Sequence, residues 1–145
     1  MKKLFLFFIV FPFFAFSMHH KTDPIIFYLD LNIVNSDIDV GEFLDGIVKT
    51  VQETEPGTQL YEYYISDNRN KVSLLEIYKS DADAVVHMKN FLTAPHSGPF
   101  LEIFEIESFK VLGNSSNELK KILNDFTKDH RILTVSYTHL TLPTN

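Results

Sequence analysis

The chain has 145 residues, of which 19 are acidic and 13 are lysine or arginine, so its formal net charge is -6. This negative charge disfavours binding to nucleic acids and to anionic membrane surfaces. The absence of cysteine excludes disulfides, thiolate nucleophiles and cysteine metal ligands, so packing or a partner subunit must supply the stability. Without its two unusual ends, the chain is long enough for one domain of about 110 residues.

The amino terminus has the order of residues found in a secretory signal peptide. Two lysines precede the apolar run 4–16, and the small residues Ala15 and Ser17 form a cleavage site. The run is shorter than the roughly 20 apolar residues that a transmembrane helix needs. We therefore predict a cleaved signal peptide over 1–17, a periplasmic or secreted domain, and no stable membrane insertion after cleavage. An uncleaved signal anchor is the alternative, and mass spectrometry of the mature amino terminus distinguishes the two.

The carboxyl terminus is unusual for another reason. Residues 135–144 read VSYTHLTLPT, which resembles the translation of a sequencing adapter. We interpret 135–145 as a non-biological remnant, to be excluded from reasoning about the fold. The helical extension over 114–134 is then expected to be truncated.

The first half of the domain is predicted to contain a strand, a helix and a hairpin. Hydrophobic and polar residues alternate over 25–33, as in a strand with one buried face. Asp39 begins a capping box, and apolar residues at helical spacing then predict a helix over 40–54. The aromatic and branched runs 60–65 and 72–78 are separated by a polar stretch, so we expect a β-hairpin.

The second half is predicted to contain two helices, a strand and one further helix. Ser80 begins a second capping box for a helix that ends before Pro95, and a short helical turn is expected over 98–104. Alternation around 108–111 predicts a fourth strand. Ser115 is expected to cap an additional amphipathic helix in the carboxyl-terminal extension.

This order predicts an α+β, ferredoxin-like β-α-β-β-α-β fold with a four-stranded antiparallel sheet and both main helices on one face. The second face of such a sheet would otherwise be exposed together with its apolar residues. We therefore predict a homodimer formed through the sheets.

Six short motifs occur in order within the domain over 24–113: Glu55-Pro56-Gly57-Thr58, Tyr61-Glu62, Leu75-Glu76-Ile77-Tyr78, Ser80-Asp81-Ala82-Asp83-Ala84, His87 and Thr93-Ala94-Pro95-His96. Together they resemble the antibiotic biosynthesis monooxygenase, or quinol monooxygenase-like, family. The resemblance implies a dimeric α/β barrel with a ligand pocket between the sheet and the helices of each subunit. It also implies oxygenation of a small aromatic or quinol-like substrate without a cofactor. Because tryptophan is absent, the Asn-Trp-His arrangement of the related haem-degrading enzymes cannot form.

His87 is the candidate catalytic residue. It shares the apolar face of its predicted helix with Ala84 and Phe91, which lie three residues before and four residues after it. A neutral imidazole there could exchange a proton with a quinol hydroxyl, since its ordinary pKa lies near neutral pH. The alternative is a core histidine that makes one hydrogen bond.

Further residues are candidates for substrate binding because aromatic faces and a few polar groups suit a planar ligand. Only one of the alternating sets on the strand 60–65 can face the pocket. Glu76 could instead be a structural carboxylate paired with the backbone or a lysine, and His96 could be an exposed loop residue. The predicted binding set is Tyr61, Tyr63, Glu76, Tyr78, Phe91 and His96.

We predict no metal site, since the spacing between His87 and His96 matches no standard zinc pattern. Two hypotheses remain. The first is an exported, cofactor-independent, monooxygenase-like enzyme acting on a small aromatic or quinol substrate. The second is a non-catalytic dimeric module that binds a small apolar ligand.

Overall fold

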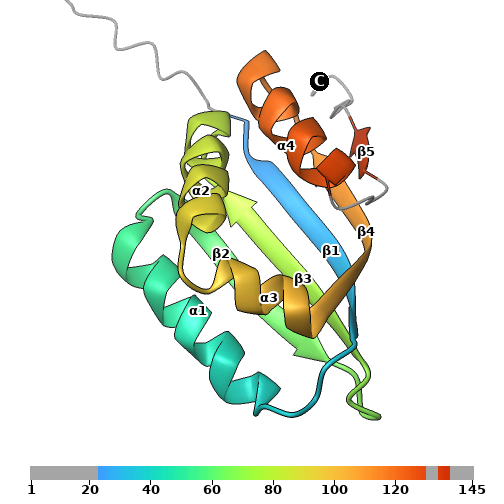
Figure 1. Cartoon of the computed structure of the whole chain (residues 1–145). Coiled ribbons are helices and arrows are strands. Elements are labelled where there is room, and N and C mark those ends of the chain that lie inside the picture. Colours follow the sequence, from blue (N-terminus) through green and yellow to red (C-terminus); the bar gives the residue numbers. More distant parts are fainter. Residues whose placement is uncertain (1–22, 130–133, 138–145) are drawn as a thin grey trace, which may run out of the picture.

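Residues 23–129 and 134–137 are described by the structure, a computed structural model (Figure 1). Four antiparallel strands form most of one sheet, in the order β2-β3-β1-β4. This arrangement confirms the predicted α+β, ferredoxin-like fold. The strands are β1 (Ile25–Ile33), β2 (Thr58–Ile65), β3 (Lys71–Tyr78) and β4 (Phe104–Leu112).

A fifth strand, which the sequence did not lead us to expect, extends the sheet. Strand β5 (Thr134–Tyr137) pairs in parallel with β4. Its last three residues belong to the segment interpreted as adapter-derived, and the origin of that segment stays a prediction. The predicted signal peptide over 1–17 and the remaining residues 138–145 lie outside the described residues.

The four helices of the described residues lie on the same side of the sheet (Figure 1). Within the described part of the chain, none of them is long and apolar enough to span a membrane. The main helices of the predicted unit are α1 and α2. Two more helices accompany them: the short α3, which follows α2, and α4, which follows β4. The bounds are α1 (Val40–Thr54), α2 (Asp81–Thr93), α3 (Ser97–Ile103) and α4 (Asn117–Asp129).

The helix caps explain where the helices begin. The Asp39 side chain accepts hydrogen bonds from the first turn of α1, and the Ser80 hydroxyl accepts one from Asp83 N. For α4 the predicted cap was wrong by one residue. The Ser116 hydroxyl, rather than that of Ser115, accepts the hydrogen bond from Leu119 N at 3.1 Å, because Ser116 stands three residues before that donor.

The turn after α1 places an acidic residue against α2. Glu55 is the carboxyl-terminal cap of α1, and its N–H donates to Val51 O at 2.9 Å. At Gly57, a Cβ atom would come within 2.0 Å of the Asp83 carboxylate, so only glycine allows this close packing. The Pro56-Gly57 turn thereby holds Glu55 next to the helix that carries His87.

The two faces of the sheet differ in burial. In β1, Phe27 and Leu29 point toward the helices and are buried, whereas the alternate residue Tyr28 is only half-buried. In β3, Leu75 and Ile77 are likewise half-buried on the face without helices. This open face therefore presents apolar side chains that no helix covers.

Candidate functional site

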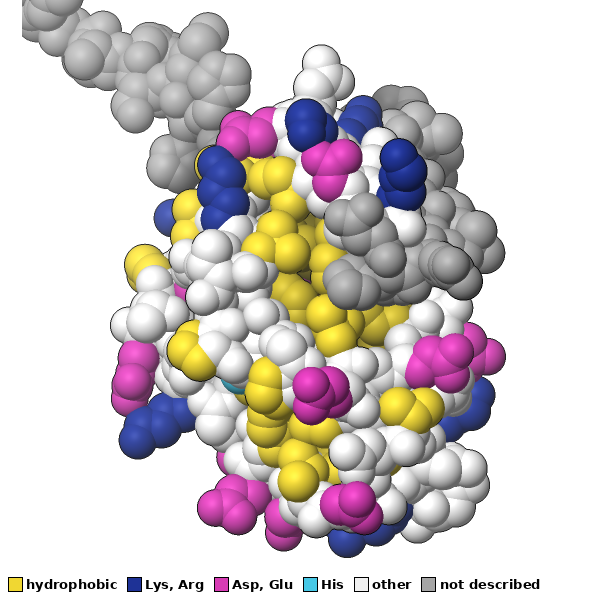
Figure 2. Space-filling view, viewed as in Figure 1, with side chains coloured by type: hydrophobic (Ala, Val, Ile, Leu, Met, Phe, Trp, Pro, Cys, Tyr) yellow, Lys and Arg dark blue, Asp and Glu magenta, His cyan; other side chains and the backbone are white. Residues whose placement is uncertain are grey.

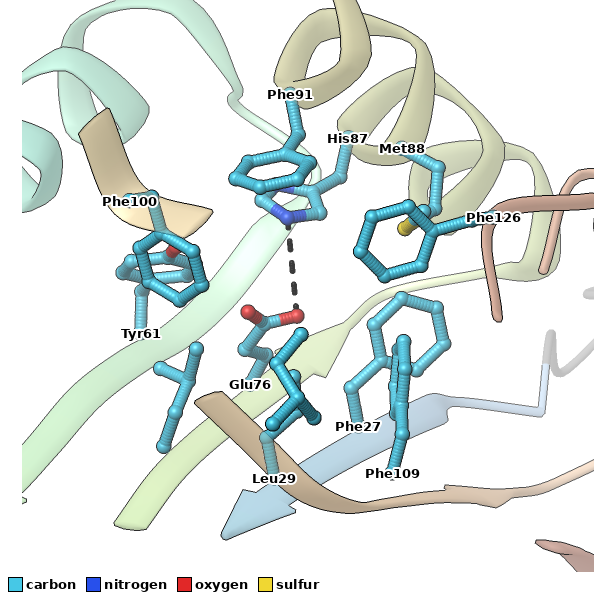
Figure 3. Close-up of a pocket in the computed structure, with 12 residues that line it drawn as sticks. Phe27, Leu29, Tyr61, Glu76, His87, Met88, Phe91, Phe100, Phe109 and Phe126 are labelled. Carbon is cyan, nitrogen blue, oxygen red and sulfur yellow. Dashed lines mark ion pairs between the residues drawn. The ribbon is translucent and has the colours of Figure 1, made fainter. Parts of the chain in front are cut away.

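A small cavity lies between the sheet and helices α2, α3 and α4 (Figure 3). Its volume is about 30 Å³, which is room for a water molecule but not for an aromatic ring. Three of the lining residues carry polar groups, and all others are apolar. The lining residues are Phe27, Leu29, Tyr61, Leu74, Glu76, His87, Met88, Phe91, Phe100, Ile106, Phe109 and Phe126.

His87 lies between two buried carboxylates. Its Nδ1 is 2.9 Å from Glu55 Oε2, and its Nε2 is 3.7 Å from Glu76 Oε2. Figure 3 shows Glu76 on β3 pointing across the cavity toward His87 on α2. The first distance is a hydrogen bond, whereas the second is too long for one. Nε2 and Glu76 therefore keep hydrogen-bonding capacity that a ligand hydroxyl can use.

Glu55 is held in place by several donors. Besides His87, Asn90 Nδ2 donates to Oε1 at 3.0 Å and the Thr58 hydroxyl donates to Oε2 at 3.1 Å. Burial acts to raise the pKa of Glu55, but the hydrogen bond and charge of His87, together with the other donors, lower it overall. Glu55 is therefore ionised at neutral pH, and it fixes the His87 ring with Nδ1–H toward itself.

Glu76 has a different environment. Burial raises the pKa of this carboxyl group above its ordinary value, and the nearby His87 charge only partly opposes the effect. Tyr78 donates a short hydrogen bond to Glu76 Oε2. Tyr78 and His87 occupy the place of the lysine or backbone partner that we considered for a structural carboxylate. Because the pKa of Glu76 is raised and that of Glu55 is lowered, Glu76 takes up a proton at a higher pH than Glu55 does.

The charges around His87 favour its protonated form. Burial lowers the pKa of the imidazole, but the charge of Glu76 and the hydrogen bond and charge of Glu55 outweigh it, so the pKa is raised. The sequence alone led us to expect a neutral imidazole. The two carboxylates, which are distant in sequence, change that expectation, and an imidazolium at this position can stabilise a developing anion.

The three predicted binding tyrosines take different positions. Tyr61 lines the cavity, with its ring centroid 5.6 Å from that of His87. Tyr78 is fully buried beside His87 and contacts Glu76 rather than the cavity. Tyr63 lies outside the cavity lining, with its hydroxyl 3.1 Å from that of Tyr61. Tyr61 and Tyr63 point to the same side of β2, as the strand period requires.

The two remaining predicted binding residues lie near each other at the end of α2. Phe91 lines the cavity and makes an edge-to-face contact with Phe100, at a centroid distance of 5.5 Å. His96 lies outside the lining, and its ring centroid is 6.3 Å from that of Phe91. Burial, followed by the positive charge of His87, lowers the pKa of His96. The structure therefore gives His96 a place beside the site rather than within it.

Three residues of the site, namely Glu55, Asn90 and Phe126, were not predicted from the sequence. Glu55 was part of a recognised motif but was not considered as a partner of His87, although an acidic residue before Pro-Gly at a helix end was a usable signal. Asn90 lies three residues after His87, next to it on the helix surface. Phe126 lies in the additional amphipathic helix of the carboxyl-terminal extension, which was not considered as part of the site. Among the described residues, no group of His, Asp and Glu side chains could hold a metal ion.

Comparison with solved structures shows that the fold of this chain also occurs in other proteins. MupZ from Pseudomonas fluorescens superimposes with a TM-score of 0.60 at 12% identity, over 84% of this chain and 94% of MupZ. The chain shares its fold with MupZ. At this identity the similarity concerns the fold alone.

Two further structures are less similar. Rv0793 from Mycobacterium tuberculosis gives a TM-score of 0.47 at 19% identity, over 65% of this chain and 97% of that one. A Bacteroides thetaiotaomicron protein provisionally named an antibiotic biosynthesis monooxygenase gives 0.42 at 20% identity, over 60% and 84%. No protein-family model and no curated protein matches the sequence.

Proposed function

We propose that this domain is an exported, cofactor-independent oxygenase that acts on a small quinol or related hydroxyaromatic substrate. The observation that carries the proposal is the pair of buried residues His87 and Glu76 in an otherwise largely apolar, aromatic-lined cavity, with the buried Glu55 hydrogen-bonded to His87. Buried titratable groups with shifted pKa values in a pocket are typical of acid-base catalysis. The motif resemblance to quinol monooxygenases supports the choice of substrate.

The cluster of Glu55, His87 and Glu76 suits removal of a proton from a substrate hydroxyl. Glu76 accepts the proton, and the His87 imidazolium stabilises the quinolate anion through its free Nε2–H. Glu55 acts as a positioning residue, because it fixes the orientation of His87. The quinolate is electron-rich and reduces O2, which is the oxidant. One quinol and one O2 give one hydroxyquinone and one water, so all atoms and electrons balance.

Oxygen consumption tests this function directly. Purified mature protein is supplied with reduced 2-methyl-1,4-benzoquinone, and the oxygen uptake is compared with the uncatalysed autoxidation of the same quinol. We expect uptake proportional to protein concentration, with the hydroxyquinone as the product in mass spectrometry. Uptake no faster than autoxidation across a panel of reduced quinones would overturn the proposed oxygenase activity.

A non-catalytic binding module is the second candidate, and the predominantly apolar lining of the cavity favours it. Both candidate functions require side chains to move, because a cavity of about 30 Å³ does not admit a ring. Binding of an oxidised quinone without any oxygen uptake from the reduced form would support this second function.

We also propose that two subunits associate through the open face of the sheet. Tyr28, Leu75 and Ile77 present half-buried apolar surface there, and a second copy would cover it. Leu75→Lys places a charge on this face without touching the helix-covered core. We expect the wild type to be a dimer in light scattering at micromolar concentration and Leu75→Lys to be a folded monomer. A monomeric wild type, or a variant that stays dimeric, contradicts this interface.

A further inference from the structure

The lining of the cavity has few polar side chains. The polar side chains of the lining are Tyr61 from β2, Glu76 from β3 and His87 from α2, and Figure 3 shows Glu76 and His87 facing each other across the cavity. A ligand can therefore form hydrogen bonds with these groups and must place the rest of its surface against hydrocarbon. Such a site favours a molecule with one hydroxylated end and an apolar remainder.

The charges of the cluster restrict the ligand further. Glu55 and Glu76 together carry two negative charges when both are ionised, and His87 supplies one positive charge. The cluster is then negative overall by one charge, and it lies in a poorly hydrated interior. A second anion placed there would be repelled strongly. We therefore expect the ring of the ligand to be uncharged.

The cavity must enlarge before it can accept a ring. A site that binds benzene has a volume of about 150 Å³, several times larger than the volume found here. Phe27 and Phe109 are poor candidates for movement, because they project from the central strands and pack edge-to-face at 5.1 Å. Phe126 differs from them, because it lies in the last turn of a peripheral helix.

Among the described residues, two polar contacts join α4 to α2, and both lie at the beginning of α4. Ser116 N donates to Asp81 Oδ1 at 2.7 Å, and Lys89 Nζ lies 2.7 Å from Glu118 Oε1. Both contacts hold the beginning of α4 against α2. Phe126 lies two turns further along and packs edge-to-face on Phe91 across the cavity, at a centroid distance of 5.9 Å.

The surface beside Phe126 is apolar. Figure 2 shows hydrophobic side chains gathered in a recess on the helix-covered face, between α2 and α4. The two helices that border the recess also line the cavity, through Met88 and Phe91 from α2 and Phe126 from α4. An apolar group attached to a ring in the cavity would reach solvent through this recess.

We propose that Phe126 is the specificity-determining gate of the site, and that the ligand is an uncharged hydroxyaromatic carrying a hydrocarbon tail. Its hydroxyl lies between Glu76 and His87, its ring takes the place that the Phe126 side chain vacates, and its tail occupies the recess between α2 and α4. The proposal rests on the proposed function for the position of the hydroxyl. It assigns the choice of ligand to α4, a helix outside the β-α-β-β-α-β unit.

Equilibrium binding of oxidised quinones tests the gate without requiring turnover. The probes are 2-methyl-1,4-benzoquinone, 2-hexyl-1,4-benzoquinone and 1,4-benzoquinone-2-carboxylate, titrated calorimetrically into the mature protein, which has no cysteine to react with them. We expect the hexyl compound to bind at least tenfold more tightly than the methyl compound, since about five additional CH2 groups leave water. The carboxylate is expected not to bind.

Variants at Phe126 separate a gate from a packing residue. Phe126→Leu and Phe126→Ala are expected to bind the methyl compound at least tenfold more tightly than the wild type, because the ring no longer has to displace a phenyl group. Phe126→Trp is expected to weaken binding of both neutral quinones at least tenfold. Phe43→Ala is the matched control, because Phe43 packs partly buried on α1 and does not line the cavity.

The outcomes distinguish this inference from the proposed function. Equal affinity for the methyl and hexyl compounds, or Phe126 variants that bind like Phe43→Ala, overturns the gate even if quinols are oxygenated. Tail-dependent and Phe126-dependent binding without oxygen uptake supports the gate and rejects the oxygenase. Should Phe126→Ala not fold, Phe126→Leu and Phe126→Trp still decide between these outcomes.

Discussion

Replacing Glu76 with glutamine is expected to slow quinol turnover by about 100- to 10,000-fold, the usual contribution of a positioned general base. Glutamine keeps the size of the side chain and can still accept the hydrogen bond from Tyr78, but it cannot take up the substrate proton. The loss should appear in kcat, because binding of the hydroxyl needs only a hydrogen-bonding partner. Oxygen uptake and the melting temperature are measured on the same preparation.

The pH profile gives an independent check on Glu76. The base must be ionised, and burial raises its pKa, so wild-type activity should fall on acidification at a higher pH than for an ordinary glutamate. On the alkaline side, activity should fall as His87, whose pKa is also raised, loses its proton. Glu107→Gln, at a half-exposed surface ion pair, is the control and should change neither limb. A Glu76→Gln variant within threefold of wild-type kcat would exclude Glu76 as the base.

The fold could be predicted from the sequence because its signals are local. Alternation over 25–33 and helical spacing over 40–54 depend on neighbouring residues, and both elements appear with those bounds. The strand pairing followed from the order of the elements. Strand β5 was not predicted, because three of its four residues lie in the segment 135–145, which we had excluded from reasoning about the fold.

The site was predictable only in part, for a physical reason. His87, Glu76 and Phe91 were recognisable because each sits in a periodic element whose inner face can be read from the sequence. The partnership of His87 with Glu55 joins residues 32 positions apart, through a turn whose geometry depends on Gly57 packing against another helix. The pKa of the imidazole is raised by the charge of Glu76 and then by the hydrogen bond and charge of Glu55. The structure therefore favours a protonated His87 on the expected face of its helix, whereas the sequence led us to expect a neutral imidazole that exchanges a proton with the substrate.

Replacing His87 with alanine is expected to lower the free energy of unfolding at pH 7 by about 3–5 kcal/mol, the usual cost of removing one partner from a buried ion pair. Glu55 and Glu76 would be left buried without a cation. Chemical denaturation between pH 4 and pH 9 measures the effect. The stabilisation from His87, whose folded pKa is raised, is complete below its unfolded pKa of about 6.5 and is lost as pH rises through the folded value.

Glu55 determines the pH below which the loss of stability in His87→Ala becomes smaller. Its folded pKa is lowered, so its contribution is present above its unfolded pKa of about 4.5 and is lost as pH falls through the folded value. The loss of stability in His87→Ala should therefore be largest between these two pH limits and shrink toward pH 4, where the unpaired carboxylates become protonated.

His96→Ala is the control, with an expected loss of stability below about 1 kcal/mol. Combining His87→Leu with Glu55→Gln and Glu76→Gln should recover most of the stability, because no buried charge then remains. A deficit below 1 kcal/mol at pH 7, or one that is equal at pH 4 and pH 7, would show that the carboxylates do not depend on His87.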